Sequence, residues 1–287
     1  MLTSSEIDRQ ISAFRMIEDI VGAMKAYAGI AIRKTDELVS NVREYEESIF
    51  QAMAGIVAHH QKIARKIEYS GQGRRILVAC GSSQGLCGLF NEKMADAVLR
   101  EIKKGDALFV IGRKLRLSLE SRRIVPEYYA DSVASASGIQ GALEEALSRL
   151  MDIYSRREFY RLAFIFTGIS GGRPQILIER VLPPVIELTG QGDNPPVKNQ
   201  NPPLLYMDAG RVFEKLIDHL IFITLYRSCA ESLRSENWYR LQSMERAGEN
   251  LRRRLSGIEA LQKYVRQEEI TEEVLEILQS GETDKKT

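Results

Sequence analysis

The sequence predicts an α/β fold in which long N- and C-terminal helices form an antiparallel coiled coil around an inserted α/β domain. All eight prolines lie between Pro126 and Pro203, so both ends lack the residue that breaks helices. In both ends apolar residues recur at alternating steps of about four and three, which is typical of a coiled-coil seam. The middle alternates short apolar runs with helical segments, which indicates an α/β sheet.

Length and composition leave room for two domains with an ordinary hydrophobic core. The chain has 287 residues, a net charge of +1 and 28% charged residues, so nothing points globally to nucleic acid or a membrane surface. Cys80, Cys87 and Cys229 form neither a disulfide framework nor a metal quartet and fit a reducing compartment. Without a signal peptide or a long apolar run, we expect no direct membrane insertion, although partners could hold the chain at a membrane.

The C-terminal segment, residues 204–287, contains the longer predicted helix. From Arg211 to Gln279 it would extend about 100 Å, which is too long for a compact domain. Its apolar stripe is narrow, which is typical of a coiled-coil seam, and is diluted by polar or small residues. These diluting positions are Arg227, Arg234, Asn237 and Gly248.

The N-terminal segment, residues 1–70, predicts the partner helix. Ser4 or Ser5 can cap its start, and the same stepping continues from Ile7 to Ile56, about 75 Å of helix with Lys25 as one polar seam position. A compact insert between the two helices makes their pairing antiparallel. Two amphipathic helices of an ordinary bundle are the alternative, but bundle helices rarely reach this length.

The insert, residues 71–203, predicts a Rossmann-like α/β domain. It begins after the turn cluster Ser70–Gly73 and closes with the Gly- and Pro-rich linker Thr189–Pro203. The last strand is expected at an edge, antiparallel to its neighbour. The predicted strands are Arg75–Cys80, Ala107–Ile111, Val125–Tyr129, Arg161–Thr167 and Gln175–Leu182, and the predicted helices are Leu89–Lys104, Arg113–Arg122 and Ile139–Tyr154.

No segment predicts catalysis, a cofactor or a metal. The loop Gly81–Gly88 follows a strand, where phosphates often bind, yet it matches neither a dinucleotide fingerprint nor a phosphate loop. Cys87 has no accompanying base, and His59, His60 and His219 lie on the predicted long helices. A nucleotide-binding enzyme remains one alternative, and a coiled-coil adaptor whose α/β head docks protein partners is another.

Three stretches, in this architecture, resemble the γ subunit of F-type rotary ATP synthases, the central stalk. Ile17–Met24 is similar to the family's run ending in Ile-Thr-Lys-Ala-Met, and Ser82–Asn91 to its Asp-Arg-Gly-Leu-Cys-Gly loop. Arg266–Glu273 is similar to the C-terminal Arg-Gln-x-x-Ile-Thr-x-Glu signature, the most specific of the three. Departures at Gly22, Ser83, Gln84 and Leu89 suggest a divergent branch, with a sodium-coupled type as one interpretation.

The resemblance implies a non-catalytic rotor subunit at the cytoplasmic face of the bacterial inner membrane. Its implied partners are the α and β subunits, the ε subunit and the c-ring, with no cofactor and no nucleic acid. In such a stalk, the diluting seam positions would permit polar contacts with the surrounding ring of α and β subunits. The coupled ion, proton or sodium, is set by subunits other than this one. The residues carried over as subunit contacts are Met24, Lys25, Arg266, Gln267, Ile270, Thr271 and Glu273. A loop of Gly85, Leu86, Cys87 and Gly88 is expected to shape a turn at the foot of the stalk, the end near the membrane.

Overall fold

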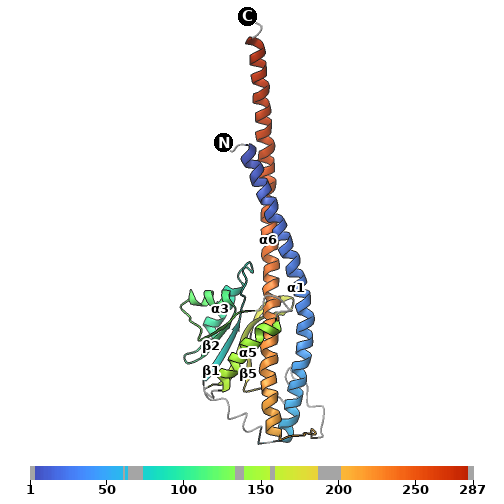
Figure 1. The fold of residues 1–287 in the computed structure, drawn as a ribbon, viewed down its shortest axis with the longest axis vertical. Coiled ribbons are helices and arrows are strands. Elements are labelled where there is room, and N and C mark those ends of the chain that lie inside the picture. The colour runs from blue at the N-terminus through green and yellow to red at the C-terminus, as the bar shows by residue number, and fades with distance from the viewer. Residues whose placement is uncertain are drawn as a thin grey trace. The chain divides into compact units, whose positions relative to one another are not determined.

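A computed structural model describes residues 4–60, 62–63, 74–132, 139–155, 159–186 and 202–283. The chain divides into two compact units. The terminal unit combines Met1–Tyr27 with Leu241–Thr287, and the sheet unit comprises Ala28–Arg240. Helices α1 (Ser4–His59) and α6 (Ala209–Thr283) each contribute residues to both units (Figure 1). The two long terminal helices predicted from the proline-free ends are therefore confirmed.

The sheet unit contains one five-stranded sheet with the order β3-β2-β1-β4-β5. Neighbouring strands are parallel except for β4 and β5, which pair antiparallel at the edge, as predicted. This is the order of a doubly wound sheet, in which the winding reverses between β1 and β4. The strands are β1 (Arg74–Cys80), β2 (Ala107–Ile111), β3 (Tyr128–Ala130), β4 (Phe159–Ser170) and β5 (Arg173–Leu182).

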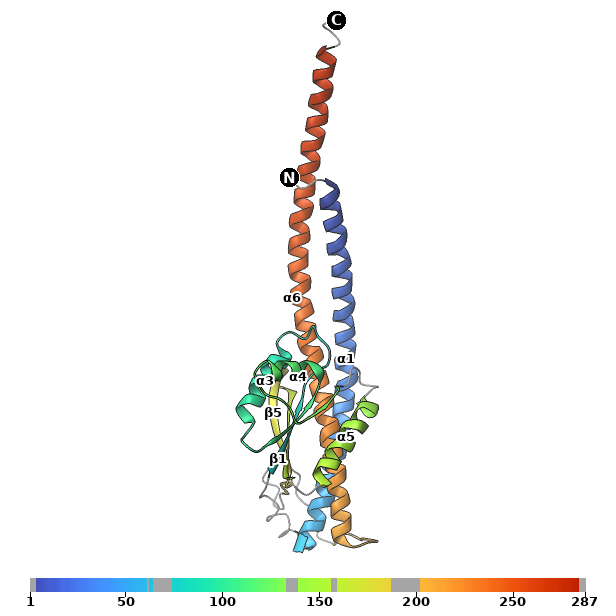
Figure 2. The same cartoon turned by 60° about the vertical axis from the view of Figure 1, so that its left-hand side comes forward.

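Helices cover both faces of this sheet because its central strands are apolar on both sides. Leu77 and Ala79 of β1 pack with α3 (Phe90–Glu101) and α4 (Arg113–Glu120). Ile76 and Val78 point to the other face, where they pack with α5 (Ile139–Ser155), α1 and α6. Within this unit α6 lies between the sheet and α1 (Figures 1 and 2).

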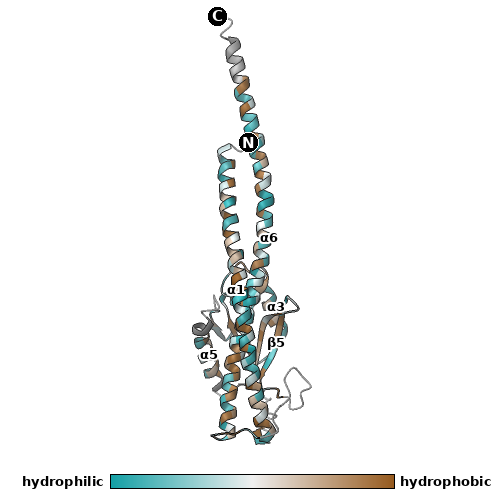
Figure 3. Cartoon of the chain, turned by 90° about the vertical axis from the view of Figure 1, so that its right-hand side faces the viewer, coloured by the Kyte–Doolittle hydropathy of each residue, from teal (hydrophilic) through white to brown (hydrophobic). Residues whose placement is uncertain are grey.

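The two long helices pair antiparallel in each unit taken by itself. In the sheet unit, Asp36 bonds Arg234 and Arg43 bonds Glu231, so rising numbers on α1 meet falling numbers on α6. In the terminal unit the same trend holds, and teal and brown residues mix along both helices (Figure 3). The terminal pairs are Asp8 with Gln262, Arg15 with Glu259, Glu18 with Arg252, and Lys25 with Glu245.

Some predicted boundaries shift for local reasons. The third strand covers Tyr128–Ala130 rather than Val125–Tyr129, and α4 ends at Glu120 rather than Arg122. Arg123 has a positive φ of 63°, and the amide of Ile124 donates to the Leu119 carbonyl, so a left-handed cap closes α4 early. Ser70–Gly73 and most of Thr189–Pro203 lie outside the described residues.

The narrow seam predicted for α6 is wrong in the sheet unit. Between Leu220 and Arg240 nearly every side chain is buried or half-buried, because the sheet covers one side of α6 and α1 covers another. Arg227 and Asn237 are therefore buried within the chain instead of facing a surrounding partner. Their hydrogen-bond partners also belong to this chain.

Candidate interaction site

The carboxyl ends of β1 and β4 form the crevice where doubly wound sheets bind ligands. Here α6 lies against both strand ends. The Ser232 hydroxyl donates to the Cys80 carbonyl at 2.9 Å, and the Ser235 hydroxyl donates to the Thr167 carbonyl at 2.8 Å. Both serines are buried. The chain's own helix therefore occupies part of this crevice.

The glycines of the adjoining loop serve close packing. A Cβ on Gly81 would lie 2.3 Å from the Cβ of Leu115, so only glycine lets β1 approach α4 this closely. Gly112 has a φ of +115°, and a Cβ there would lie 2.7 Å from the Gly81 carbonyl carbon. This geometry explains the glycines without a phosphate ligand.

The predicted foot loop, Gly85–Gly88, turns through two left-handed residues. Leu86 and Gly88 have φ values of 64° and 54°, and the Leu86 side chain is 57% exposed. Cys87 is 3% exposed, and burial raises the pKa of its thiol. The loop thus presents Leu86 outward and keeps Cys87 as a protonated packing residue, which does not favour a nucleophile.

Polar contacts fix this loop to neighbouring helices. The side-chain amide of Asn91 on α3 donates to the Ser82 hydroxyl at 2.8 Å and accepts from the Ser82 amide at 3.0 Å. From α6, Arg240 donates to the Gly85 carbonyl at 3.3 Å and to Asn237 at 2.7 Å. Arg240 also pairs with Glu236, and burial raises the pKa of Glu236 to about 7 although Arg240 opposes this rise.

Five charged residues, which we call the ionic cluster, join α1, α6 and β5. Arg227 of α6 lies at the centre, 2.6 Å from carboxylate oxygens of both Glu46 and Glu179. Arg43 of α1 approaches Glu231 of α6 at 2.7 Å. The Arg227 and Glu231 side chains are only 8% and 0% exposed. The cluster therefore cross-links both long helices to the edge strand.

Burial and charge act against each other in the ionic cluster. Burial raises the pKa of Glu46, although the Arg227 charge and a hydrogen bond from Thr224 lower it. Burial lowers the pKa of Arg227, but the negative charges of Glu179 and Glu46 raise it by a larger amount, so the net shift is upward. Gly168 makes room for the cluster, because a Cβ there would lie 2.4 Å from Oε2 of Glu231. Sequence periodicity alone gave Arg227 only as a position that dilutes the predicted α6 seam.

The carried-over contact residues fall into two places within the terminal unit. Arg266, Gln267, Ile270, Thr271 and Glu273 are all exposed near the C-terminal end of α6. Met24 is half-buried on α1, and Lys25 bonds Glu245 at 3.1 Å. Because Glu245 precedes Arg266 by about six helical turns, these two groups lie about 30 Å apart along α6. The structure thus gathers the first five but does not bring Met24 and Lys25 to them.

Fold and site together define a class: an α/β domain packed on an antiparallel pair of long helices, with one helix occupying part of the domain's own ligand crevice. The chain belongs to the ATP synthase family, whose family model matches residues 3–283. The resemblance seen in the sequence is thereby confirmed. Among the described residues, no helix is both long and apolar enough to cross a membrane.

Curated relatives agree over nearly the whole chain. The ATP synthase gamma chain of Heliobacterium modesticaldum is 25% identical, with 95% of this chain and 96% of the relative covered. The ATP synthase gamma chain of Geobacter sp. is 24% identical, with 99% and 100% covered. The matches therefore span both terminal segments and the insert.

Solved structures share the fold. The rotor of Euglena gracilis mitochondrial ATP synthase aligns with a TM-score of 0.63 at 15% identity, covering 93% of this chain and 98% of that one. The central stalk and c-ring structure of Tetrahymena thermophila mitochondrial ATP synthase gives 0.60 at 16% identity, covering 79% and 99%. The predicted fold of two long helices around an α/β insert is confirmed.

Proposed function

We propose that the chain is the central-stalk subunit of an ATP synthase. It couples ion flow through the membrane sector to ATP synthesis or hydrolysis in a hexamer of α and β subunits. The observation that carries the proposal is the C-terminal end of α6. This end lies in a chain of the ATP synthase family and leaves its signature residues, Arg266–Glu273, exposed.

The exposed α6 end is suited to bind α and β subunits in turn. Ile270 is 57% exposed and sits among charged and amide side chains, including Arg266 and Gln267. An apolar centre with a polar surround is the usual composition of a protein interface. As the stalk rotates, these side chains face successive subunits and stabilise different states of each, which is how rotation is coupled to catalysis.

The sheet unit serves as the foot, with the ε subunit and the c-ring as partners. The foot loop offers Leu86 to such a partner, and Arg240 ties the loop to α6. Force applied to the sheet passes to both helices through the ionic cluster, because Arg227 bonds β5 and α1 at once. Met24 and Lys25 are proposed as further contacts with the hexamer.

The subunit is non-catalytic, and the nucleotide sites belong to its partners. Support comes from the β1 and β4 crevice, which Ser232 and Ser235 of α6 partly occupy. The complex lies at the cytoplasmic face of a bacterial membrane, and the chain is held there peripherally by its partners. The three predicted segments, residues 1–70, 71–203 and 204–287, then act as axle, foot and axle.

Affinity purification of the tagged full chain from native membranes tests this function. We expect the α, β and c subunits to be recovered with it, and a chain recovered alone would contradict the proposal. Ile270→Asp should reduce recovery of α and β at least tenfold, since it places a charge in the apolar centre of the interface. Val125→Asp is the matched control, because Val125 is 78% exposed on the sheet unit and lies outside the proposed contacts.

A further inference from the structure

Two buried cysteine thiols meet where the carboxyl end of β1 contacts α6. The sulfur of Cys80, the last residue of β1, lies 3.9 Å from the sulfur of Cys229 on α6. The two residues are only 1% and 5% exposed, and they are 149 positions apart in the sequence. Neither belongs to the proposed subunit contacts, so the proposed function uses neither thiol.

A hydrogen bond holds the backbones on the two sides of this pair together. Ser232, about one helical turn after Cys229, donates from its hydroxyl to the Cys80 carbonyl at 2.9 Å. A disulfide places its sulfurs about 2.05 Å apart, so the two sulfurs must approach by about 2 Å. Rotation about the Cα–Cβ bonds can bring them together while the backbones stay in place.

The third cysteine, Cys87, contacts a different set of atoms. Its sulfur lies 3.6 Å from the Ser82 hydroxyl and 3.5 Å from the side-chain nitrogen of Asn91. The geometry therefore favours pairing of Cys80 with Cys229, and Cys87 provides a control within the same chain.

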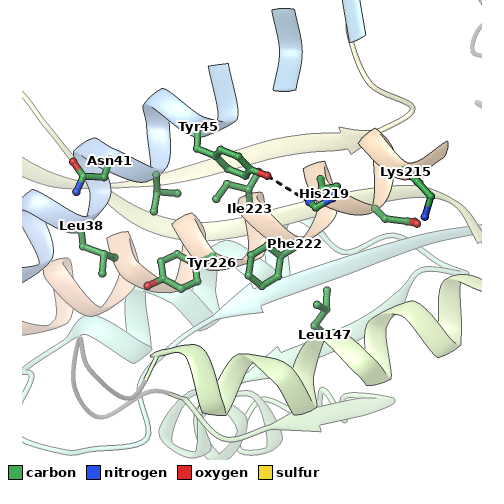
Figure 4. A pocket seen from close by; sticks show the side chains of 11 residues that line it. Leu38, Asn41, Tyr45, Leu147, Lys215, His219, Phe222, Ile223 and Tyr226 are labelled. Carbon is green, nitrogen blue, oxygen red and sulfur yellow. Dashed lines mark hydrogen bonds between the residues drawn. The ribbon is translucent and has the colours of Figure 1, made fainter. Parts of the chain in front are cut away.

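A small cavity borders both sulfurs of the pair. Its volume is about 10 Å³, close to the smallest space that holds one water molecule. The much larger open groove lined by Tyr45, His219 and Phe222 has no cysteine among its described lining residues (Figure 4). An oxidant as small as hydrogen peroxide therefore needs only a local opening of the chain to reach the pair.

The surroundings of the pair keep it reduced in the absence of an oxidant. The hydrogen bond with Cys229 and burial raise the pKa of Cys80 well above its ordinary value, so Cys80 is a protonated thiol. A protonated thiol is a poor nucleophile, which keeps the pair as thiols in a reducing compartment.

We propose that Cys80 and Cys229 form a disulfide when the chain meets hydrogen peroxide, and that this bond links α6 covalently to β1. Cys229, the more exposed thiol, attacks one peroxide oxygen. The O–O bond breaks, the thiol proton leaves with the departing hydroxide as water, and Cys229 becomes a sulfenic acid. The Cys80 sulfur then attacks the sulfenic sulfur, and the S–O bond breaks as the Cys80 proton leaves in a second water. Two thiols are oxidised to one disulfide while the peroxide is reduced to two waters.

Peptide mapping of the folded full chain after peroxide treatment tests the pairing. Free thiols are alkylated, and trypsin then releases Ile76–Lys93, which carries Cys80 and Cys87, and Ser228–Arg234, which carries Cys229. In Cys87→Ser we expect these two peptides to be joined by a disulfide that a reductant opens. Cys80→Ser is the matched control, because the same two peptides still carry one cysteine each, and at least about tenfold less of the joined product should form.

Thermal unfolding tests whether the bond links α6 to the sheet. A disulfide that closes a long loop restricts the unfolded chain, so peroxide should raise the midpoint of Cys87→Ser by about 5 °C relative to Cys80→Ser. Midpoints of the reduced variants near that of the parent chain show that both fold.

Three results would overturn the proposal. They are unlinked peptides in both peroxide-treated Cys87→Ser and the treated parent chain, equal linkage in Cys80→Ser, and a midpoint that the bond does not raise. Recovery of α and β subunits with the chain is a separate measurement, so failure of the disulfide leaves the proposed stalk function standing.

Discussion

Helices α1 and α6 pair in both units, but their ion pairs are exposed in one unit and buried in the other. Comparing them distinguishes the part of the helices that is open to partner subunits from the part that holds the sheet. In the terminal unit, Arg15 and Glu259 form a pair whose side chains are 64% and 38% exposed. In the sheet unit, Arg227 of α6 and Glu46 of α1 form a pair whose side chains are 8% and 10% exposed. Ion pairs in water contribute little to stability, whereas a buried charge depends on its partners. One stretch therefore keeps its surface open to partners, and the other fixes the domain to the helices.

The largest expected difference between the units comes from removing one arginine in each. Arg227→Met leaves the buried carboxylate of Glu46 and the half-buried carboxylate of Glu179 without their cation, and leaves Glu231 with Arg43 alone. It should lower the free energy of unfolding by about 3–5 kcal/mol. Arg15→Met removes only an exposed pair and should change it by less than about 1 kcal/mol. Denaturant unfolding of both variants measures the contrast. Equal effects would show that burial does not distinguish the units.

A second expected difference is in the pH dependence of the sheet unit. Burial raises the pKa of Glu236 from its ordinary 4.5 to about 7, so the folded chain retains a proton that the unfolded chain loses. The stabilisation that comes from this retained proton is fully present below pH 4.5. The free energy of unfolding then falls by up to about 3 kcal/mol as the pH rises to 7. Glu46, whose pKa is also raised, adds in the same direction.

Glu236→Gln should flatten most of this pH dependence, because glutamine does not titrate. Glu259→Gln in the terminal unit is the control and should leave the profile unchanged, since its side chain is 38% exposed. Thermal unfolding between pH 5 and 7 provides the measurement. A wild-type chain whose stability rises over this interval would contradict the assignment.

Glycine substitutions should act in opposite directions in the two units. Gly81→Ala forces Leu115 and β1 apart and should destabilise the chain by about 1–3 kcal/mol. Gly22→Ala places a methyl group where no atom lies within 4 Å, in the interior of α1. It should stabilise the chain by about 0.5–1 kcal/mol, because alanine favours helix more than glycine does. The same sign for both substitutions in unfolding experiments would contradict the packing described here.

The sequence predicted elements well where one physical signal dominated. The proline-free ends predicted α1 and α6, and the five-residue apolar run Ala107–Ile111 matches β2 at both ends. The antiparallel edge strand followed from the tight turn before it, where Gly171 and Gly172 have positive φ. Boundaries shifted where a cap decided the ending, as at Arg123.

The sequence could not predict which polar residues of α6 are buried. Periodicity describes one face of a helix, whereas Ser232, Ser235 and Glu236 are buried on the side that the sheet covers. Arg227 therefore looked like a weak position of the seam, because the carboxylates that it contacts belong to other elements, Glu46 to α1 and Glu179 to β5.

The most direct test compares assembly and stability for matched variants of the two settings. Ile270→Ala, in the exposed α6 end, should lower the ATPase activity of the purified complex without changing unfolding of the free chain. Arg227→Met should lower the unfolding midpoint of the free chain, even when no partner is present. The account assigns subunit contacts to the C-terminal end of α6 and stability to the ionic cluster. It is wrong if Ile270→Ala leaves the complex fully active, or if it destabilises the free chain as much as Arg227→Met does.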